Sequence, residues 1–432
     1  MTTATIRAGS KLSEQVHDFV RRDFTPHFGR RQAEFASDEL WKQFLDLGTE
    51  LWLDSGNFEE VRSVWTREFS ALTTNNTLLN KEVQTGTYDA LISEAADLLA
   101  GFEDLTEREV MLEIAFILNA THGLRLVERF DAYVSVEEHT DLANDVERAV
   151  EYARRYYAIC PERFYVKIPF TPAGLLATRQ ARQEGIGINH TLGFSARQNY
   201  VITRLSQPNF VNVFLGRLNS FISENGLGTG DYVGERATLA SQEAVRLLRE
   251  VKGFDTRQIG ASFRSWEQYV NLAGIDVMTA PPQVARELRE KKDELPPLEN
   301  QLGQNRAPGV NDDIDPEEIG LDTLWFINEE VVRCVDALGE EDLDGFDPES
   351  LLDFFEAQGC SDFLVRWSDA EIATSAGEGK IPTLRNWADF LANRIIGLDS
   401  LMNLAGLNTF IADQNQMDDH VQDVLKKTGV RR

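Results

Sequence analysis

Cysteine and histidine are scarce in this chain of 432 residues, and neither is placed for metal or disulfide chemistry. The three cysteines, Cys160, Cys334 and Cys360, are too few and too scattered for a disulfide framework or a zinc site. The six histidines include no pair at the spacing typical of metal ligands. The sequence therefore offers no metal site.

Long apolar runs are also missing. The first seven residues, Met-Thr-Thr-Ala-Thr-Ile-Arg, contain no apolar signal region, and we find no run long enough to span a bilayer. We therefore expect a cytoplasmic protein that does not contact a membrane.

Positive charge is the third shortage. Lysine and arginine together number 43 against 71 acidic residues, which gives a net charge of -28. Nucleic acids and anionic membrane surfaces require a basic footprint, so neither is expected as a partner. A small anionic substrate stays possible, because a local pair of arginines can bind it inside an acidic shell. The composition, 42% hydrophobic and 9% aromatic, is that of a folded protein with a sizeable core.

Between about residues 50 and 295, short strands alternate with helical segments. The predicted strands are Glu50–Ser55, Phe69–Asn75, Arg129–Val136, Phe164–Pro169, Gly187–Phe194, Phe210–Gly216, Thr256–Ser262 and Ile275–Thr279. Eight such units predict an α/β protein of the (β/α)8, or TIM, barrel type. A doubly wound sheet is the alternative, ranked lower because no Gly-rich phosphate loop follows any of these strands.

Helical patterns flank the predicted barrel. We expect an N-terminal helical segment over 1–48, the catalytic barrel over 49–295, and a linker with a helical extension packing on the barrel over 296–432. Three helix starts carry recognisable caps: Ser37 before Asp38-Glu39, Asp347 before Pro348, and the capping box Ser368-Asp369-Ala370-Glu371.

The last predicted helix is amphipathic. It carries Phe410, Met417, Val421 and Leu425 on one side. Such a stripe docks on an apolar surface. Packing within the chain and contact in a homodimer are both compatible with it.

One strand, Phe164–Pro169, carries a lysine near its C-terminal end. Side chains alternate along a strand, so Lys167 shares a face with Tyr165. A buried lysine is costly unless it is used, because desolvation favours the neutral amine. A neutral amine attacks carbonyl carbons and forms Schiff bases. Alternatively, the side chain extends from the strand end to water.

The C-terminal ends of six other strands are unusually polar. In a barrel these ends converge on one face, where active sites form. Their polar residues are Asp54, Asn75, Glu137, Asn189, Thr191, Arg217, Ser262 and Arg264. Each position alone is typical of a solvated strand end, but together they predict a site around Lys167.

This set of side chains could carry out Schiff-base chemistry on a ketose. Lys167 would attack the carbonyl carbon, and Glu137 would move protons through a water held by Thr191. Asp54 would deprotonate the hydroxyl whose loss cleaves the carbon–carbon bond.

The other polar residues suit the rest of a sugar phosphate. Asn75 and Asn189 could hydrogen-bond the hydroxyls of the retained three-carbon unit. Arg217 and Arg264, with Ser262, could bind a terminal phosphate, for which the guanidinium fork is suited. The alternative for the arginines is ion pairing at a strand end.

The chain resembles the transaldolase family in motifs that extend from about residue 48 to about residue 290. The matching stretches are Leu-Trp-Leu-Asp-Ser-Gly-Asn (51–57), Thr-Thr-Asn-Asn (73–76), Val-Lys-Ile-Pro-Phe-Thr-Pro-Ala-Gly-Leu (166–175), Glu-Gly-Ile-Gly-Ile-Asn-His-Thr-Leu-Gly-Phe-Ser (184–195), Phe-Leu-Gly-Arg (214–217) and Gly-Ala-Ser-Phe-Arg (260–264). Each motif alone is weak, and together they are specific. A weaker resemblance resumes at Phe410-Ile-Ala-Asp-Gln, where the family has a helix near the site.

The resemblance implies a (β/α)8 barrel with its Schiff-base lysine at Lys167, the roles given above for the other residues, and no metal or organic cofactor. The family reaction moves a dihydroxyacetone unit from fructose 6-phosphate or sedoheptulose 7-phosphate to erythrose 4-phosphate or glyceraldehyde 3-phosphate. These sugar phosphates belong to the pentose phosphate pathway.

The chain departs from the family pattern in three places. Asn76 stands where the family usually has proline, which leaves that loop less rigid. Asn212 replaces a serine expected to contact the bound intermediate, so Asn212 joins the predicted substrate-binding residues and the donor sugar stays open. The insert at about 296–380 is longer than a compact family member needs. It caps the site, mediates assembly or packs on the barrel.

Two other functions stay open. A fructose-6-phosphate aldolase of the same superfamily would release free dihydroxyacetone, although that subgroup resembles a site with glutamine where this chain has Glu137. A barrel that binds sugar phosphates without turnover is the second alternative.

Overall fold

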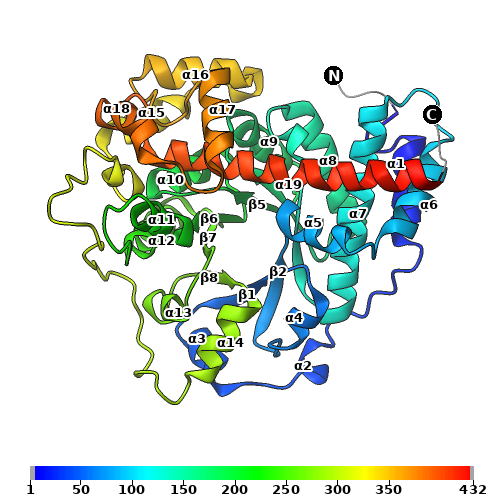
Figure 1. Ribbon diagram of the computed structural model, residues 1–432, viewed down its shortest axis with the longest axis horizontal. Helices are drawn as coiled ribbons and strands as arrows, with labels where there is room; N and C mark the ends of the chain where they lie inside the picture. The colour runs from blue at the N-terminus through cyan, green and yellow to red at the C-terminus, as the bar shows by residue number, and fades with distance from the viewer. Residues whose placement is uncertain (1–4, 429–432) are drawn as a thin grey trace.

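The computed structural model describes residues 5–428, which fold around a closed barrel of eight parallel strands (Figure 1). The strands are β1 (Glu50–Asp54), β2 (Phe69–Thr73), β3 (Tyr133–Glu137), β4 (Phe164–Pro169), β5 (Ile188–Thr191), β6 (Phe210–Phe214), β7 (Arg257–Ala261) and β8 (Val277–Ala280). Each strand pairs with the next in sequence, and β8 closes the barrel onto β1. The predicted (β/α)8 fold is confirmed.

Helices surround the barrel and precede it. The N-terminal helices are α1 (Lys11–Arg21), α2 (Arg31–Glu34) and α3 (Glu39–Asp46). Those of the barrel are α4 (Phe58–Arg62), α5 (Asn76–Gln84), α6 (Asp89–Leu99), α7 (Glu107–Phe130), α8 (Val146–Ile159), α9 (Pro172–Gln183), α10 (Ala196–Ser206), α11 (Leu215–Glu224), α12 (Val233–Lys252), α13 (Glu267–Asn271) and α14 (Pro282–Glu290). Because helices cover the outside and side chains fill the inside, nearly all strand residues are buried, including polar ones such as those of β5.

Helix α7 corrects two expectations. Its length and mean hydropathy of 1.4 would suffice for a membrane span, contrary to our reading of the sequence, but most of the helix is buried inside the protein. The third strand does not begin at Arg129. Arg129 and Phe130 complete α7, the chain turns at Asp131 with φ of 48°, and β3 begins at Tyr133. Phe130 is buried as part of the helix's apolar face, which a strand-like reading of the local sequence misses.

Aromatic side chains fill the barrel below the polar residues. The Trp52 and Phe210 rings lie 4.7 Å apart between centroids, and Tyr165 lies 5.0 Å from Phe210. Above this apolar floor, the strand register pairs Glu137 with Lys167 and Lys167 with Asn189. Tyr165 and Lys167 therefore share the inward face of β4, as the alternation predicts.

The C-terminal extension begins with a segment that runs along one side of the barrel and ends in five helices (Figure 1). These helices are α15 (Glu329–Leu338), α16 (Pro348–Ala357), α17 (Asp369–Glu378), α18 (Leu384–Ala392) and α19 (Leu398–Thr428). The predicted caps at Asp347 and Ser368 are confirmed. The cap at Ser37 is wrong. Asp38 caps α3, because the Ser37 hydroxyl instead donates to the carboxylate of Glu68.

Helix α19 lies across the carboxyl ends of the strands and packs against α5, α6 and α17 (Figure 1). Phe410, Met417 and Val421 of its apolar stripe are buried. Its Asp418 carboxylate accepts a hydrogen bond of 2.6 Å from Arg108 on α7. The stripe therefore docks within the chain, so it supplies no argument for a homodimer.

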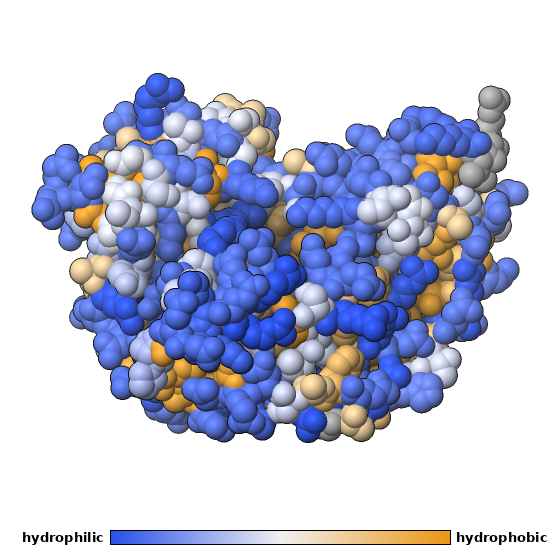
Figure 2. Space-filling model, turned by 60° about the horizontal axis from the view of Figure 1, so that its bottom comes forward, coloured by the Kyte–Doolittle hydropathy of each residue, from blue (hydrophilic) through white to orange (hydrophobic). Residues whose placement is uncertain are grey.

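The exposed surface agrees with the acidic composition. The face in Figure 2 is mostly hydrophilic, and its apolar patches are small and scattered. Few large apolar side chains are exposed among the described residues. Such a surface keeps a protein with net charge of -28 well hydrated.

A buried ion-pair network fastens α19 to the barrel. Arg197 on α10 donates to Asp399 through Nε at 2.8 Å and through Nη2 at 2.7 Å, and to Asp362 at 2.8 Å. Ser195 adds a bond of 2.6 Å to Asp399. Asp399 and Arg197 are both buried, so removing one partner leaves an uncompensated charge in the interior.

We expect Asp399→Ala to lower the free energy of unfolding by about 3 kcal/mol or more, because it strands the Arg197 guanidinium. Asp336→Ala is the matched control, since it removes a partner of Arg204 on the same helix, and Asp336 is exposed. That change should cost less than about 1 kcal/mol. Urea denaturation followed by tryptophan fluorescence measures both. Equal losses in the two variants would contradict the role of the buried network.

Candidate active site

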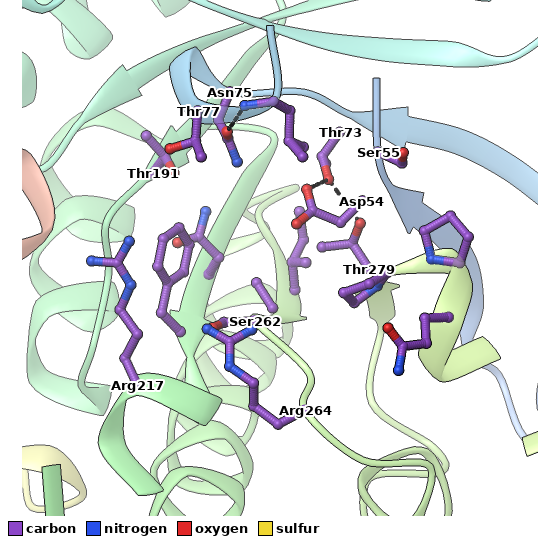
Figure 3. A pocket seen from close by; sticks show the side chains of 18 of the residues that line it. Asp54, Ser55, Thr73, Asn75, Thr77, Thr191, Arg217, Ser262, Arg264 and Thr279 are labelled. Carbon is purple, nitrogen blue, oxygen red and sulfur yellow. Dashed lines mark hydrogen bonds between the residues drawn. The ribbon is translucent and has the colours of Figure 1, made fainter. Parts of the chain in front are cut away.

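A cavity of about 600 Å³ opens at the carboxyl ends of the strands (Figure 3). Nine of the ten predicted site residues line it: Asp54, Asn75, Lys167, Asn189, Thr191, Asn212, Arg217, Ser262 and Arg264. The tenth, Glu137, contacts Lys167. The structure therefore brings all ten predicted residues together.

Lys167 is buried at the inner end of the cavity. Its amine donates a hydrogen bond of 2.9 Å to the carbonyl oxygen of Thr74 and lies 3.8 Å from Glu137 Oε2. The same oxygen of Glu137 accepts a bond of 3.2 Å from the backbone N–H of Asn76. Burial raises the pKa of Glu137, and the Lys167 charge opposes this rise. An amine beside a carboxyl group with a raised pKa is suited to exchange protons with it.

Asp54 is bonded by Thr73, which in turn contacts Thr279, and we predicted neither threonine as a site residue. Thr73 donates a bond of 2.6 Å to Asp54 Oδ1, and the Thr73 and Thr279 hydroxyls lie 2.9 Å apart. Because Thr73 gives its proton to Asp54, Thr279 must donate to Thr73. Burial raises the pKa of Asp54, while Lys167 and the Thr73 bond lower it. Thr73 and Thr279 each lie near a strand end, but the sequence does not show that they are close to Asp54.

The asparagines of β5 and β6 form a connected group. Asn189 donates to Ser135 Oγ at 3.1 Å, and Asn212 donates to the His190 carbonyl at 3.0 Å. Asn212 Oδ1 accepts from the Gly193 N–H at 3.2 Å. The Asn212 side chain therefore tethers β6 to the end of β5 and also lines the cavity.

Asn75 is not the strand end that the sequence predicted. β2 stops at Thr73, and Asn75 caps α5 by accepting a bond of 2.8 Å from the Leu78 N–H. An asparagine side chain at a helix start favours this cap over continuing the strand. Its amide nitrogen is left to point toward the cavity (Figure 3).

Arg217, Ser262 and Arg264 line the same cavity, with Ser262 beside Arg264, and Arg217 lies on the side away from Asp54 and Thr279 (Figure 3). Two strand ends were wrong here. β6 stops at Phe214, and Arg217 lies in the first turn of α11; β7 stops at Ala261. The chain bends sharply because Ser262 has φ of 67°, and a side chain at Gly216 would lie 2.1 Å from the Ser262 carbonyl oxygen.

Arg217 is buried, and its Nη1 has no hydrogen-bond partner among the described residues. The rings of Phe214 and Phe410 flank the guanidinium at 5.6 and 5.7 Å. Burial and the charge of Arg264 lower the pKa of Arg217 to about 10. A buried cation with a free donor, beside the N-terminus of α11, is suited to bind an anion.

Thr191 also carries a free polar atom. Its side chain is fully buried at the end of β5, and Oγ1 has no partner within residues 5–428. A buried hydroxyl in this state can hold a ligand atom or a water molecule.

Other cavity residues escaped the sequence analysis. Thr77, Lys81 and Lys380 lie on loops or helices that carry no strand-end signal, and Ser55 ended the first predicted strand but was not chosen as a site residue. Phe410 was noted for the amphipathic stripe of the last helix and for a weak resemblance near the site, but not as a cavity residue. Lysine scarcity could have directed attention to Lys81 and Lys380, since the chain has only ten lysines by count of the sequence.

The fold and the cavity define a (β/α)8-barrel protein whose single site contains a buried lysine, two carboxyl groups and a cationic end formed by Arg217 and Arg264. A family model described as transaldolase/fructose-6-phosphate aldolase matches residues 51–332, and the chain belongs to this family.

Curated relatives are similar over most of their own length. A transaldolase of Xanthomonas campestris pv. campestris (strain B100) is 28% identical over 299 residues, covering 67% of this chain and 90% of the relative. A transaldolase of Xanthomonas oryzae pv. oryzae (strain MAFF 311018) is 27% identical over 296 residues, with the same coverage. A probable transaldolase of Dictyostelium discoideum is 26% identical over 265 residues, covering 60% of this chain and 81% of the relative.

We expect Thr73→Val to move the acidic limb of the kcat/KM profile toward higher pH. The Thr73 bond lowers the pKa of Asp54, so removing it lets burial raise that pKa further and protonates Asp54 at a higher pH. Thr73→Ser keeps the hydroxyl and should keep the wild-type profile. A pH–rate profile of the three proteins measures this. An unmoved acidic limb in Thr73→Val would show that Asp54 does not set it.

Glu138 makes a separate prediction about stability. Both of its carboxyl oxygens are buried without a hydrogen-bond partner in the described part of the chain. Burial, and then the charge of Glu137, raise its pKa well above the ordinary value. Above the unfolded pKa of a glutamate, the folded chain therefore holds a proton that the unfolded chain releases. Stability consequently falls as pH rises from there through the folded pKa.

Glu138→Gln removes this titration and keeps the side-chain shape. We expect a higher Tm than wild type at pH 8 and little difference near pH 4, where the wild-type group is protonated in both states. Calorimetry across this range measures it. Glu267→Gln is the matched control, because Glu267 is an exposed glutamate. A difference in Tm between Glu138→Gln and wild type that does not change with pH would contradict a raised pKa of Glu138.

Proposed function

We propose that the protein is a transaldolase that transfers a dihydroxyacetone unit from a ketose phosphate to an aldose phosphate through a Schiff base on Lys167. The observation that carries the proposal is the buried Lys167 amine, 3.8 Å from Glu137, in one cavity with Asp54 and an arginine pair. This arrangement provides a nucleophile, two groups for proton transfer and a place for phosphate.

The first half of the reaction builds the Schiff base. The neutral amine of Lys167 attacks C2 of the ketose, and the carbonyl oxygen takes a proton to give a carbinolamine. Glu137 then donates a proton to the leaving hydroxyl, which departs as water. Thr191, with its free buried hydroxyl, is placed to hold that water.

The second half breaks and remakes a carbon–carbon bond. Asp54 takes the proton of the C4 hydroxyl, the C3–C4 bond breaks, and its electron pair moves toward the iminium nitrogen to give an enamine. An aldose phosphate leaves, and a second one enters. The enamine carbon attacks the new aldehyde, and Asp54 returns its proton to the new alkoxide. Hydrolysis of the Schiff base releases the product ketose.

Contacts around the cavity support this substrate class. Asn75 and Asn189 line the cavity, and we assign them to the hydroxyls of the three-carbon unit. Asn212 lies beside Asn189, with 3.4 Å between Asn212 Nδ2 and Asn189 Oδ1. Arg217 and Arg264 lie at the cationic end with Ser262. Fructose 6-phosphate or sedoheptulose 7-phosphate as donor, and erythrose 4-phosphate or glyceraldehyde 3-phosphate as acceptor, fit this division.

The proposal also covers the pathway, the compartment and the cofactor requirement. These sugar phosphates place the reaction in the pentose phosphate pathway, in the cytoplasm and without a bound cofactor. The three cysteines are free and buried, as is usual in a reducing compartment.

Borohydride trapping tests the Schiff base. After incubation with fructose 6-phosphate and borohydride, we expect peptide mass spectrometry to find a three-carbon adduct on Lys167. Lys167→Met should lose the adduct and nearly all turnover, by roughly a thousandfold or more, because it removes the amine that lies beside Glu137. It should still fold, as circular dichroism would show.

Lys252→Met is the matched control, because Lys252 is exposed on α12 away from the cavity. It should keep both the adduct and the turnover. Substantial activity in Lys167→Met would overturn the mechanism. Turnover of fructose 6-phosphate that depends on erythrose 4-phosphate supports the transferase, whereas release of free dihydroxyacetone without acceptor would make the protein an aldolase of the same family.

A further inference from the structure

Lys380 belongs to the C-terminal extension, yet it lines the active-site cavity. It lies between α17 and α18, outside the residues 51–332 that match the family. The barrel therefore does not supply all the charge at its own site.

The segment that carries Lys380 is fixed on both sides. Before it, Glu378 accepts hydrogen bonds from Asn386 Nδ2 at 2.6 Å and from Trp387 Nε1 at 2.9 Å. Gly379 follows with φ of 81° and ψ of -137°, a conformation that essentially only glycine adopts. This conformation ends α17 and turns the chain toward the cavity.

After Lys380, the chain is tied to the barrel. The side chain of Asn225, which follows α11, donates a hydrogen bond of 3.0 Å to the Pro382 carbonyl and accepts one of 2.8 Å from the Leu384 N–H. Because α11 also carries Arg217 in its first turn, one barrel helix positions both cations. Contacts of the residues before and after Lys380 therefore fix its position.

Lys380 joins a group of cations that lack acidic partners. Lys81, Arg217, Arg264 and Lys380 all line the cavity, and within residues 5–428 none of them forms an ion pair within 4.0 Å, although Asp54, Glu60, Glu287 and Glu290 line the cavity too. Partial burial and the charges of Arg217 and Arg264 lower the pKa of Lys380, while Asp413 opposes this shift. Asp413 is itself occupied by a hydrogen bond from Thr77. Unpaired cations gathered in one cavity attract an anion.

The rest of the chain makes this concentration of charge significant. The protein carries a net charge of -28, which repels a sugar phosphate in solution. Of the ten lysines counted in the sequence, Lys81, Lys167 and Lys380 line this cavity. A local positive field at the cavity therefore has to overcome the field of the whole molecule.

We propose that Lys380 is a specificity-determining residue that binds the substrate's phosphate group together with Arg217 and Arg264, so that the C-terminal extension completes the phosphate site. This inference rests on the proposed function, because it concerns the phosphate of the same sugar-phosphate substrate. The ammonium group contributes a charge-assisted hydrogen bond to the phosphate and none to the carbon–carbon chemistry.

Kinetics of Lys380→Gln test this role. We expect the KM for fructose 6-phosphate to rise roughly tenfold, the effect of losing one charge-assisted hydrogen bond, and kcat to stay within about twofold. KM for a non-phosphorylated acceptor, glyceraldehyde, should not change. Lys380→Arg should recover most of the affinity. Lys292→Gln is the control, because it removes an exposed lysine from beyond α14, outside the cavity.

Calorimetric titration with inorganic phosphate gives a readout that needs no turnover. Wild type and Lys292→Gln should bind phosphate alike, and Lys380→Gln should bind roughly tenfold more weakly. If Lys380→Gln matches Lys292→Gln in both KM and phosphate affinity, the role of Lys380 is overturned. Absence of phosphate binding by wild type would also overturn it.

The two proposals fail in different ways. A wild-type protein that binds phosphate through Lys380 but turns over no ketose phosphate would refute the transaldolase proposal and leave the phosphate site standing. If the protein transfers dihydroxyacetone and Lys380→Gln leaves the KM unchanged, the transaldolase proposal stands and the role of Lys380 is refuted. Matching melting curves of the variants exclude misfolding as the cause.

Discussion

The placement of one lysine side chain beside acidic groups inside the barrel constrains the rest of this structure. Lys167 lies on the inward face of β4, with Glu137 3.8 Å away and the Thr74 carbonyl at 2.9 Å. Here the amine and the carboxyl group come from neighbouring strands in fixed register, and a shift of one residue would turn one of them outward. The closed barrel provides that register, and the aromatic floor below keeps the pair away from water on the inner side.

The same arrangement makes the site a source of instability. Glu137 and Asp54 have raised pKa values because they are buried, and Arg217 and Thr191 hold polar atoms that no described residue satisfies. Each such group costs free energy in the folded chain. The contacts that offset this cost lie elsewhere, in the apolar core and in ion pairs such as that of Arg197 with Asp399. Strain and unsatisfied groups gathered at one place are typical of functional sites.

The sequence predicted the strands better than the loops between them. The bounds of β4 agree with the prediction, since alternation and apolar content decide a buried strand locally. The ends of β2, β5, β6 and β7 were set too late. Capping by Asn75, the positive φ of Leu192 and Ser262, and the close approach at Gly216 depend on neighbours distant in the sequence. All ten predicted site residues nevertheless meet, because a residue just beyond a strand end still reaches the same face of a barrel. Thr73 and Thr279 needed the closure of β1, β2 and β8 to become neighbours of Asp54, which no local pattern shows.

The C-terminal extension alters the electrostatics of the barrel as well as its shape. Gly406 lets α19 approach closely, since a side chain there would lie 2.9 Å from Leu192 and 3.5 Å from Arg217. This approach brings the Phe410 ring against the Arg217 guanidinium, whose pKa burial then lowers to about 10. A cation shielded from water interacts more strongly with an anion, because the effective dielectric constant around it is lower. The family match ends at residue 332, whereas the helix that shields Arg217 and the lysine that stands with it lie beyond that point. In this chain, how strongly Arg217 and its neighbouring cations bind an anion therefore depends on Phe410 and Lys380, which lie outside the barrel.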